Sequence, residues 1–165
     1  MLVPVLASAA GATPYKAYRR AEVAPLYQLP YSERFWGQGF LRQGEHTFLF
    51  VTLDKSGHDQ EFQYKDHFIS ANRFQWQSQN RTTRASVSGR SIEAHASQGI
   101  AVHLFVRSRS KTPDGRGAPF YYCGPVEFVS WTGDKPITVI WNLSVPVPEV
   151  LWPELGVPSA KSPDL

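Results

Sequence analysis

The chain has 165 residues, the length of one domain, and its 42% share of hydrophobic residues is enough for a single core. Charged residues make up only 19%, which excludes the charge-rich and hydrophobic-poor class of disordered chains. The only cysteine is Cys123, which excludes a disulfide framework and favours a reduced compartment. No apolar run reaches the length of a bilayer span, so no membrane partner is expected.

Basic residues are concentrated in the middle third of the chain. Residues 73–116 contain eight basic residues against Glu93 and Asp114, whereas residues 117–165 contain two basic residues against five acidic ones. A local excess of positive charge is typical of a surface that contacts a polyanion such as nucleic acid, and also of an ordinary solvated face.

The first third of the chain predicts one helix and one buried strand. Residues 1–12 are expected to be a flexible lead-in. A Thr-Pro pair at residues 13–14 favours a helix start, and Pro25 is expected to end or kink that helix. Residues 30–46 read as an irregular connection anchored by two aromatic residues, Trp36 and Phe40. Residues 47–53 are almost continuously apolar, which predicts a strand buried on both faces.

The remaining elements are mostly strands. Residues 73–79 alternate strictly, so that Phe74 and Trp76 share one face and three glutamines share the other. A helical turn is expected within the polar segment, at residues 91–97. Three further strands are predicted at residues 100–107, 120–131 (bent at Gly124-Pro125) and 136–143, with a basic loop at 108–117 and docking of residues 150–152 on the body.

These elements together predict an α+β, mainly β, barrel-like domain of five or six strands over residues 13–155. Residues 156–165 form a Pro-rich tail that is expected to be loose.

Sequence motifs for catalysis are absent. The chain has no G-x-x-x-x-G-K-[ST] phosphate loop and no G-x-S-x-G turn, and its five histidines lack zinc spacing. Glu61 with Lys65, or Asp54 with Lys55, would fit a nuclease-like acid and lysine pattern, but such pairs arise often by chance. We therefore expect a recognition domain without catalytic residues, cofactor or metal. A small nuclease is an alternative, and it predicts metal-dependent cleavage that is lost on replacing Glu61 or Asp66.

Several stretches of the chain, in a fixed order, carry a resemblance to a known family. The most specific are Phe-Val-Thr-Leu-Asp-Lys-Ser at 50–56, Tyr64-x-Asp66, and Phe-x-Trp-Gln-Ser-Gln-Asn at 74–80. The others are Tyr-Arg-Arg-Ala-Glu-Val at 18–23, Gly89, His95, Leu-Phe-Val-Arg at 104–107, Phe-Tyr-Tyr-Cys-Gly-Pro-Val at 120–126, Gly-Asp-Lys-Pro at 133–136 and Trp-Asn-Leu at 141–143. Over roughly residues 15–155, the chain resembles the C-terminal domain family of bacterial restriction helicases (DUF3427-type). That family includes the SRA-like target-recognition domain of SauUSI-type modification-dependent restriction enzymes.

The resemblance implies an SRA-like, PUA-related fold, which is a curved and partly closed β barrel with flanking helices. Domains of this kind bind double-stranded DNA and flip one modified base into a pocket. The implied function is recognition of 5-methylcytosine or 5-hydroxymethylcytosine during restriction of phage DNA in the bacterial cytoplasm. The helicase and nuclease parts of the SauUSI type do not occur in this sequence, so cleavage and translocation do not carry over. A separate nuclease or helicase subunit is the second candidate partner.

Candidate site residues follow from the chemistry of base flipping. An aromatic pocket would stack on the base, and a carboxylate would accept a hydrogen bond from the cytosine N4 amine; Asp66 could also simply cap a loop. The candidate base-pocket residues are Tyr64, Asp66, Phe74, Trp76 and Tyr121. The candidates for reading a base edge or filling the vacated gap are Gln77, Ser78, Gln79 and Asn80. The candidate phosphate contacts are Arg81, Arg84, Arg107, Arg109, Lys111 and Arg116.

Two other functions fit the same residues. The first is recognition of another modified base, such as N6-methyladenine, or of RNA. The second is a protein-interaction module that docks a helicase or nuclease partner, in which case the aromatic residues would be core or surface residues without a polar-lined pocket.

Overall fold

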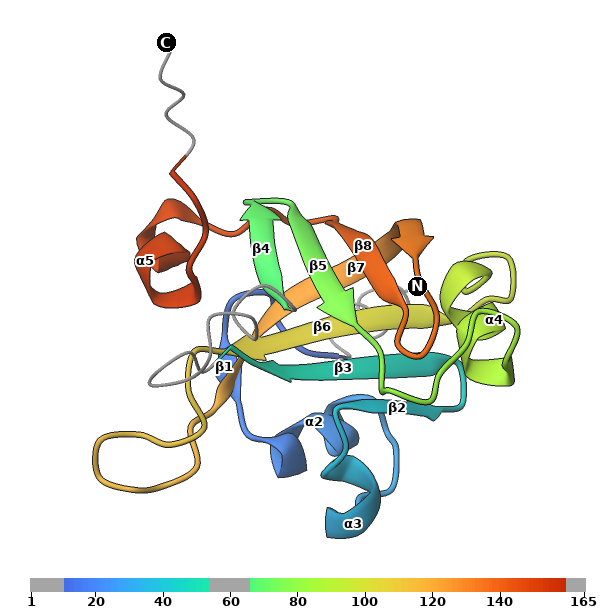
Figure 1. The fold of residues 1–165 in the computed structure, drawn as a ribbon. Coiled ribbons are helices and arrows are strands. Elements are labelled where there is room, and N and C mark those ends of the chain that lie inside the picture. Colours follow the sequence, from blue (N-terminus) through green and yellow to red (C-terminus); the bar gives the residue numbers. More distant parts are fainter. Residues whose placement is uncertain (1–10, 54–65, 160–165) are drawn as a thin grey trace, which may run out of the picture.

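The computed structural model describes residues 11–53 and 66–159, and a single eight-stranded sheet dominates them (Figure 1). The chain is therefore α+β and mainly β, as the sequence predicts, with more strands than expected. The strands are β1 (Ala17–Tyr18), β2 (Phe40–Gln43), β3 (His46–Thr52), β4 (His67–Ser70), β5 (Arg73–Gln77), β6 (Ala101–Arg107), β7 (Phe120–Thr132) and β8 (Thr138–Leu143). The helices are α2 (Arg20–Leu26), α3 (Glu33–Trp36), α4 (Val87–Glu93), the 3-10 helix η2 (Glu149–Leu151) and α5 (Trp152–Leu155).

The strands follow the order β2-β3-β6-β7-β8-β5-β4, and β1 pairs with β7 off this path. Among the described residues the sheet is not closed, because β2 and β4 form its two ends. Only the β3–β6 pair in this order is parallel, with Leu49 opposite Leu104. Thr52 and Arg107 therefore end their strands side by side, and this end of the sheet carries the candidate site.

The sheet curves until its β2–β3 end faces β5. The ring centroids of Phe40 on β2 and Trp76 on β5 lie 5.8 Å apart, although these strands are far apart in the strand order. Figure 1 shows the end of β5 reaching β6 and the chain that follows it passing in front of β3. We call the space between β2–β3 and β5 the seam.

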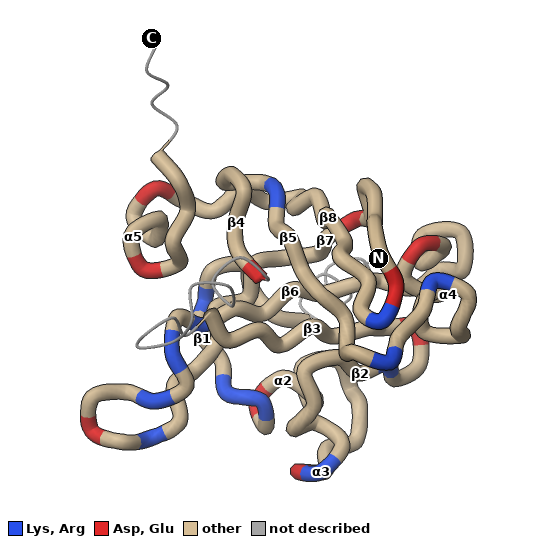
Figure 2. The backbone as a smooth tube through the Cα atoms, viewed as in Figure 1, with Lys and Arg blue, Asp and Glu red and all other residues tan. Residues whose placement is uncertain are grey.

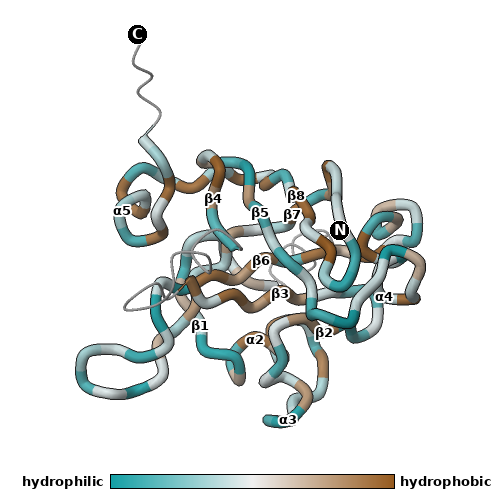
Figure 3. Tube along the Cα trace, viewed as in Figure 1, coloured by the Kyte–Doolittle hydropathy of each residue, from teal (hydrophilic) through white to brown (hydrophobic). Residues whose placement is uncertain are grey.

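Two hydrophobic clusters lie on opposite faces of β3. Leu49 and Val51 pack in the inner cluster with Trp141, whereas Phe48 and Phe50 pack in the outer cluster with residues of α2 and α3. Figure 3 shows the hydrophobic residues concentrated along β3 and β6, in the middle of the molecule. This confirms the prediction that the apolar run at 47–53 is buried on both faces.

The outer cluster contains a chain of buried polar groups. His103 is 6% exposed, and its Nδ1 lies 2.8 Å from the Tyr122 hydroxyl while its Nε2 lies 3.0 Å from His46 Nδ1. Burial, together with the neighbouring His46, lowers the pKa of His103 to about 3. Burial also raises the pKa of Tyr122 and lowers that of His46. The Tyr27 ring packs against both imidazoles, and its centroid lies 5.1 Å from the ring centroid of His46 and 4.8 Å from that of His103.

Several local predictions need correction. No helix starts at residues 13–14, because Ala17 and Tyr18 pair with β7; the helix begins at Arg20, where the Arg19 N–H donates to the Glu22 carboxylate at 2.7 Å. The connection over residues 30–46 is not irregular, since it contains α3 and β2. The expected turn at 91–97 is α4, which begins earlier because the Ser86 hydroxyl accepts a hydrogen bond from the Gly89 N–H.

Two predictions for the C-terminal half are confirmed: the bend in β7 and the packing of Leu151 and Trp152 on the body. The bend in β7 falls at Gly124, whose φ of +87° accompanies a shift of register against β6. Leu151 and Trp152 pack against the inner cluster, and the Trp152 indole N–H donates to the Val147 carbonyl at 2.7 Å, whereas Val150 is exposed. The prediction that the chain is loose from residue 156 onward is wrong for Val157, which is buried against the same cluster.

Within residues 11–53 and 66–159, no helix combines the length and the apolar character that crossing a membrane requires.

Candidate nucleic-acid interface

A cavity of about 260 Å³ opens at the seam between β2–β3 and β5. Five residues that the sequence analysis singled out meet here, although they come from different stretches: Asp66, Trp76, Gln77, Ser78 and Gln79. The opposite wall of this seam cavity is formed by Gly39, Phe40, Phe50, Val51 and Thr52. The volume is slightly below the range of about 300–1,000 Å³ that is usual for ligand pockets, so the space suits a group the size of one base.

Two aromatic rings meet across this cavity. Trp76 is only 5% exposed and is held between Phe40 and Trp141, whose ring centroid lies 6.4 Å away. It therefore forms a fixed wall, whereas the half-buried Phe40 offers the more accessible ring. The sequence analysis treated Phe40 only as an anchor, because nothing local shows that β2 faces β5.

Asp66 immediately precedes β4 and ties it to the end of β5. Its Oδ1 accepts a hydrogen bond from the Gln77 N–H at 2.8 Å, so it caps the strand, as one reading of the sequence expects. The backbone contact fixes the carboxylate at the wall of the cavity.

The polar residues that end β5 divide into two pairs. Gln77 and Ser78 are engaged by the neighbouring strand, since the Gln77 amide donates to the Thr138 hydroxyl at 3.1 Å and the Ser78 hydroxyl accepts from the Ile137 N–H at 2.9 Å. Gln79 and Asn80 are exposed, and only Gln79 lines the cavity. The second pair is therefore the better placed to reach a DNA duplex.

The two other candidate pocket residues that the structure describes, Phe74 and Tyr121, do not line the seam cavity. Phe74 is fully buried, with its ring edge-on to Phe68 at 4.7 Å, so it has no surface to offer a base. Tyr121 lines a different cavity. Tyr64 lies outside the described residues.

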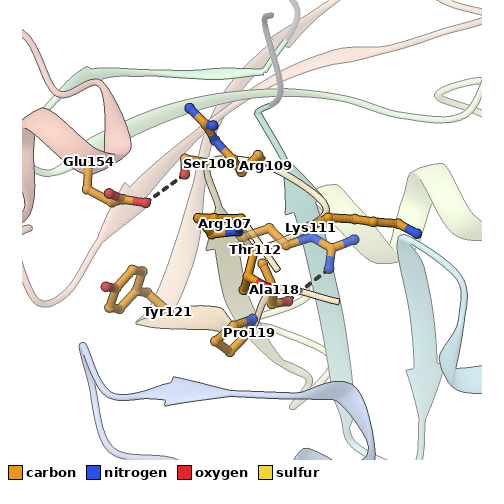
Figure 4. Close-up of a pocket in the computed structure, with 10 residues that line it drawn as sticks. Arg107, Ser108, Arg109, Lys111, Thr112, Ala118, Pro119, Tyr121 and Glu154 are labelled. Carbon is orange, nitrogen blue, oxygen red and sulfur yellow. Dashed lines mark hydrogen bonds between the residues drawn. The ribbon is translucent and has the colours of Figure 1, made fainter. Parts of the chain in front are cut away.

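This second cavity, of about 320 Å³, lies between the β6–β7 loop and α5 (Figure 4). We call it the loop cavity. The Ser108 hydroxyl donates to Glu154 Oε2 at 2.6 Å and so connects the loop to α5. The lining residues are Arg107, Ser108, Arg109, Lys111, Thr112, Pro113, Ala118, Pro119, Tyr121 and Glu154, which include three of the candidate phosphate contacts.

Arg107 lies between the two cavities. Its Nε donates to the Thr52 hydroxyl at 2.8 Å and its Nη1 to the Ala118 carbonyl at 2.9 Å, while its guanidinium lies 4.2 Å from the Phe120 ring centroid. Because Thr52 lines the seam cavity and Arg107 lines the loop cavity, this hydrogen bond joins their walls. Burial lowers the pKa of Arg107.

Sequence reasoning missed Arg20, which packs near Arg107. Its guanidinium lies 4.7 Å from the Phe50 ring centroid and 5.0 Å from that of Phe120. Its pKa is lowered by burial and by the charge of Arg107, and no acidic side chain of the described residues forms an ion pair with either arginine. Two partly buried cations that form no ion pair with a described acidic residue favour a bound anion at this end of the sheet. The only signal for Arg20 was its place in the stretch at 18–23.

The structure does not bring the six candidate phosphate contacts together. Arg84 lies on the segment after β5, where it forms an ion pair with Asp134 at 3.5 Å. The Arg84 N–H also donates to Asp134, and it holds the pKa of that carboxyl below its ordinary value. Figure 2 shows basic residues both on the β6–β7 loop and near α4. Arg81 belongs with Arg84, whereas Arg107, Arg109, Lys111 and Arg116 belong to the β6–β7 loop region.

No cluster of three or more His, Cys, Asp or Glu side chains able to hold a metal ion occurs in the described parts of the chain. The sequence model of a family described as "Domain of unknown function (DUF3427)" matches residues 12–155. Among curated proteins, no match to the chain is found.

Proposed function

The chain belongs to the DUF3427 family of domains, and we propose that it reads modified bases by flipping a 5-methyl- or 5-hydroxymethylcytosine out of double-stranded DNA into the seam cavity. In this proposal the curved, open sheet with flanking helices is an SRA-like, PUA-related fold. The domain supplies recognition in anti-phage restriction, and a nuclease or helicase partner supplies cleavage.

The observation that carries the proposal is the meeting of aromatic and carboxylate groups in one base-sized cavity. Phe40 and Trp76 provide rings, and Asp66 provides an acceptor fixed by its bond to the Gln77 N–H. A ring with an amino group at its edge matches this arrangement, because stacking and a charge-assisted hydrogen bond then act together.

The energies are of the right size. Flipping a base out of a duplex costs a few kcal/mol, and stacking on an aromatic side chain returns about 1–3 kcal/mol per base. A hydrogen bond to a charged acceptor adds about 1.5–3 kcal/mol. A single added methyl group changes binding by only about 1–3 kcal/mol, so we expect roughly 10- to 200-fold preference for the modified base.

The basic residues on either side of the seam support the duplex in this proposal. Arg107 and Arg20 place positive charge near the ends of β3 and β6, and Arg81 and Arg84 follow β5. Contacts of this kind fix the position of a duplex through its phosphates and do not read its sequence.

The test measures binding by fluorescence anisotropy to duplexes that differ at one base, at two salt concentrations. The bases are cytosine, 5-methylcytosine, 5-hydroxymethylcytosine and N6-methyladenine. Asp66→Asn keeps an oxygen for the Gln77 N–H but removes the charge, so it should weaken binding of the flipped cytosine, modified or not, without unfolding the chain. Glu93→Gln, an equal charge change at an exposed position of α4, is the matched control.

A preference that survives high salt, together with binding of modified cytosine that weakens in Asp66→Asn and not in Glu93→Gln, supports the proposal. Equal and salt-sensitive binding to every duplex would leave only a phosphate contact and would contradict it. Preference for N6-methyladenine would identify a different base.

A further inference from the structure

The loop cavity has two chemically different sides. In the view of Figure 4, Tyr121 and Glu154 lie on one side, and the ends of the Arg107 and Lys111 side chains lie on the other. Tyr121 is half-buried on β7, so its ring position is fixed by the sheet. The cavity therefore offers an aromatic surface and a carboxylate opposite the Arg107 and Lys111 cations, with Arg109 as a third cation of its lining.

This combination does not suit a bare phosphate, because Glu154 would repel it. It suits a nucleotide, whose phosphate would face the cations and whose base would lie against Tyr121. One oxygen of Glu154 already accepts from Ser108, and the carboxylate has acceptor capacity left for an amino group on the base edge. Adenine, cytosine and guanine carry such an amino group, whereas thymine does not.

The two cavities are close enough to serve neighbouring nucleotides. The bond of 2.8 Å between the Thr52 hydroxyl and Arg107 Nε joins a wall of the seam cavity to a wall of the loop cavity. Arg107 is thus placed for the phosphate that links one nucleotide to the next.

We propose that the loop cavity holds the nucleotide adjacent to the flipped base, with its phosphate at Arg107 and Lys111 and its base between Tyr121 and Glu154. This inference rests on the proposed function of the seam cavity. Its consequence is that the domain opens two consecutive positions of one strand and prefers a flanking base that carries an amino group.

Opening two positions has a measurable effect. Unstacking is costly in a paired duplex and less so where the bases are already mismatched. Mismatches opposite both nucleotides should therefore tighten binding more than a mismatch opposite the modified base alone.

The experiment uses the full chain and duplexes with one modified cytosine, whose neighbour on each side in turn is adenine, thymine or an abasic position. For the neighbour that enters the loop cavity, we expect the abasic position to weaken binding by about five- to hundredfold, the range that stacking of one base supplies. Tyr121→Leu fills similar space without an aromatic face, so it should remove this dependence, and Tyr121→Phe should keep it.

Glu154→Gln tests the amino-group preference. The amide oxygen still accepts from the Ser108 hydroxyl, so the loop stays attached, but the preference for adenine over thymine should fall. Glu149→Gln, an exposed acidic residue of the adjacent η2 outside the cavity, should leave it unchanged.

The outcomes separate the two proposals. If modified cytosine is preferred but no neighbour on either side matters, the seam cavity reads the base and the inference about the loop cavity is wrong. If no modification is preferred but binding still depends on the neighbour through Tyr121, the loop cavity binds a nucleotide and the proposed function fails. If the neighbour matters equally in the wild type, Tyr121→Leu and Glu154→Gln, the effect belongs to the DNA and the inference is overturned.

Discussion

Acid should destabilise this fold through one buried imidazole, that of His103. It lies between His46 and Tyr122 in the outer cluster, under the ring of Tyr27, and its pKa is lowered to about 3. In the unfolded chain the same group has a pKa of about 6.5. The unfolded state therefore binds a proton more tightly than the folded state does. The stability contribution is complete above pH 6.5 and is lost as the pH falls from 6.5 towards 3.

The magnitude follows from the two pKa values. Between pH 7 and pH 5, the linkage relation gives a loss of about 2 kcal/mol in the free energy of unfolding from this group alone. His46, which is half-buried and also has a lowered pKa, acts in the same direction. Burial lowers the pKa of His46, and the negative charge of the exposed Glu45 beside it offsets part of this lowering.

Urea unfolding of wild type and His103→Gln at pH 7, 6 and 5, followed by tryptophan fluorescence, measures this effect. Glutamine keeps hydrogen-bonding groups for Tyr122 and His46 but does not titrate, so the variant should be less stable at pH 7 and lose about 2 kcal/mol less on acidification. Parallel pH profiles for the two proteins would refute the reasoning, because the proton uptake would then lie elsewhere.

Three further predictions concern stability. Phe74→Ala should cost about 3–5 kcal/mol in urea unfolding, since the ring is fully buried, and the folded fraction should keep its base preference. Gly89→Ala should cost about 1–3 kcal/mol or more, because the added Cβ would lie 2.1 Å from the Thr83 carbonyl oxygen; the exposed Val87→Ala on the same helix should change the thermal midpoint little. Tyr15→Phe should cost about 0.5–1.5 kcal/mol by removing the hydroxyl that donates to the Val145 carbonyl at 2.6 Å, and an unchanged midpoint would contradict that role.

The sequence predicts those parts of the fold that are determined by local pattern. The continuous apolar run of β3 and the two-residue alternation of β5 are enough to identify both strands and their buried faces. The sequence did not predict β1 and β2, because both are short and form only through pairing with other strands. β1 is two residues paired with the start of β7, and β2 pairs with β3. Propensity alone favoured a helix at residues 13–14, and strand pairing overrode it.

The candidate site could be predicted on one wall only. Asp66, Trp76 and the polar residues that end β5 are close together in the sequence, so one stretch points to them all. The opposite wall, with Phe40 and Thr52, arises from curvature of the sheet, which no local pattern encodes. Alternation also placed Phe74 on the same face as Trp76, but only the residue nearer the end of the strand reaches the cavity.

The parallel pairing of β3 with β6 has a consequence for how the chain can be divided. Thr52 pairs with Arg107, which follows it by 55 positions, and β5 is held by β8, which comes still later. Each wall of the seam therefore depends on a strand that is made after it, and no contiguous fragment ending before residue 143 contains both walls with their supports. The seam therefore requires the chain from β2 to β8 as one piece, so cutting it between β5 and β8 should destroy the fold and the proposed recognition together.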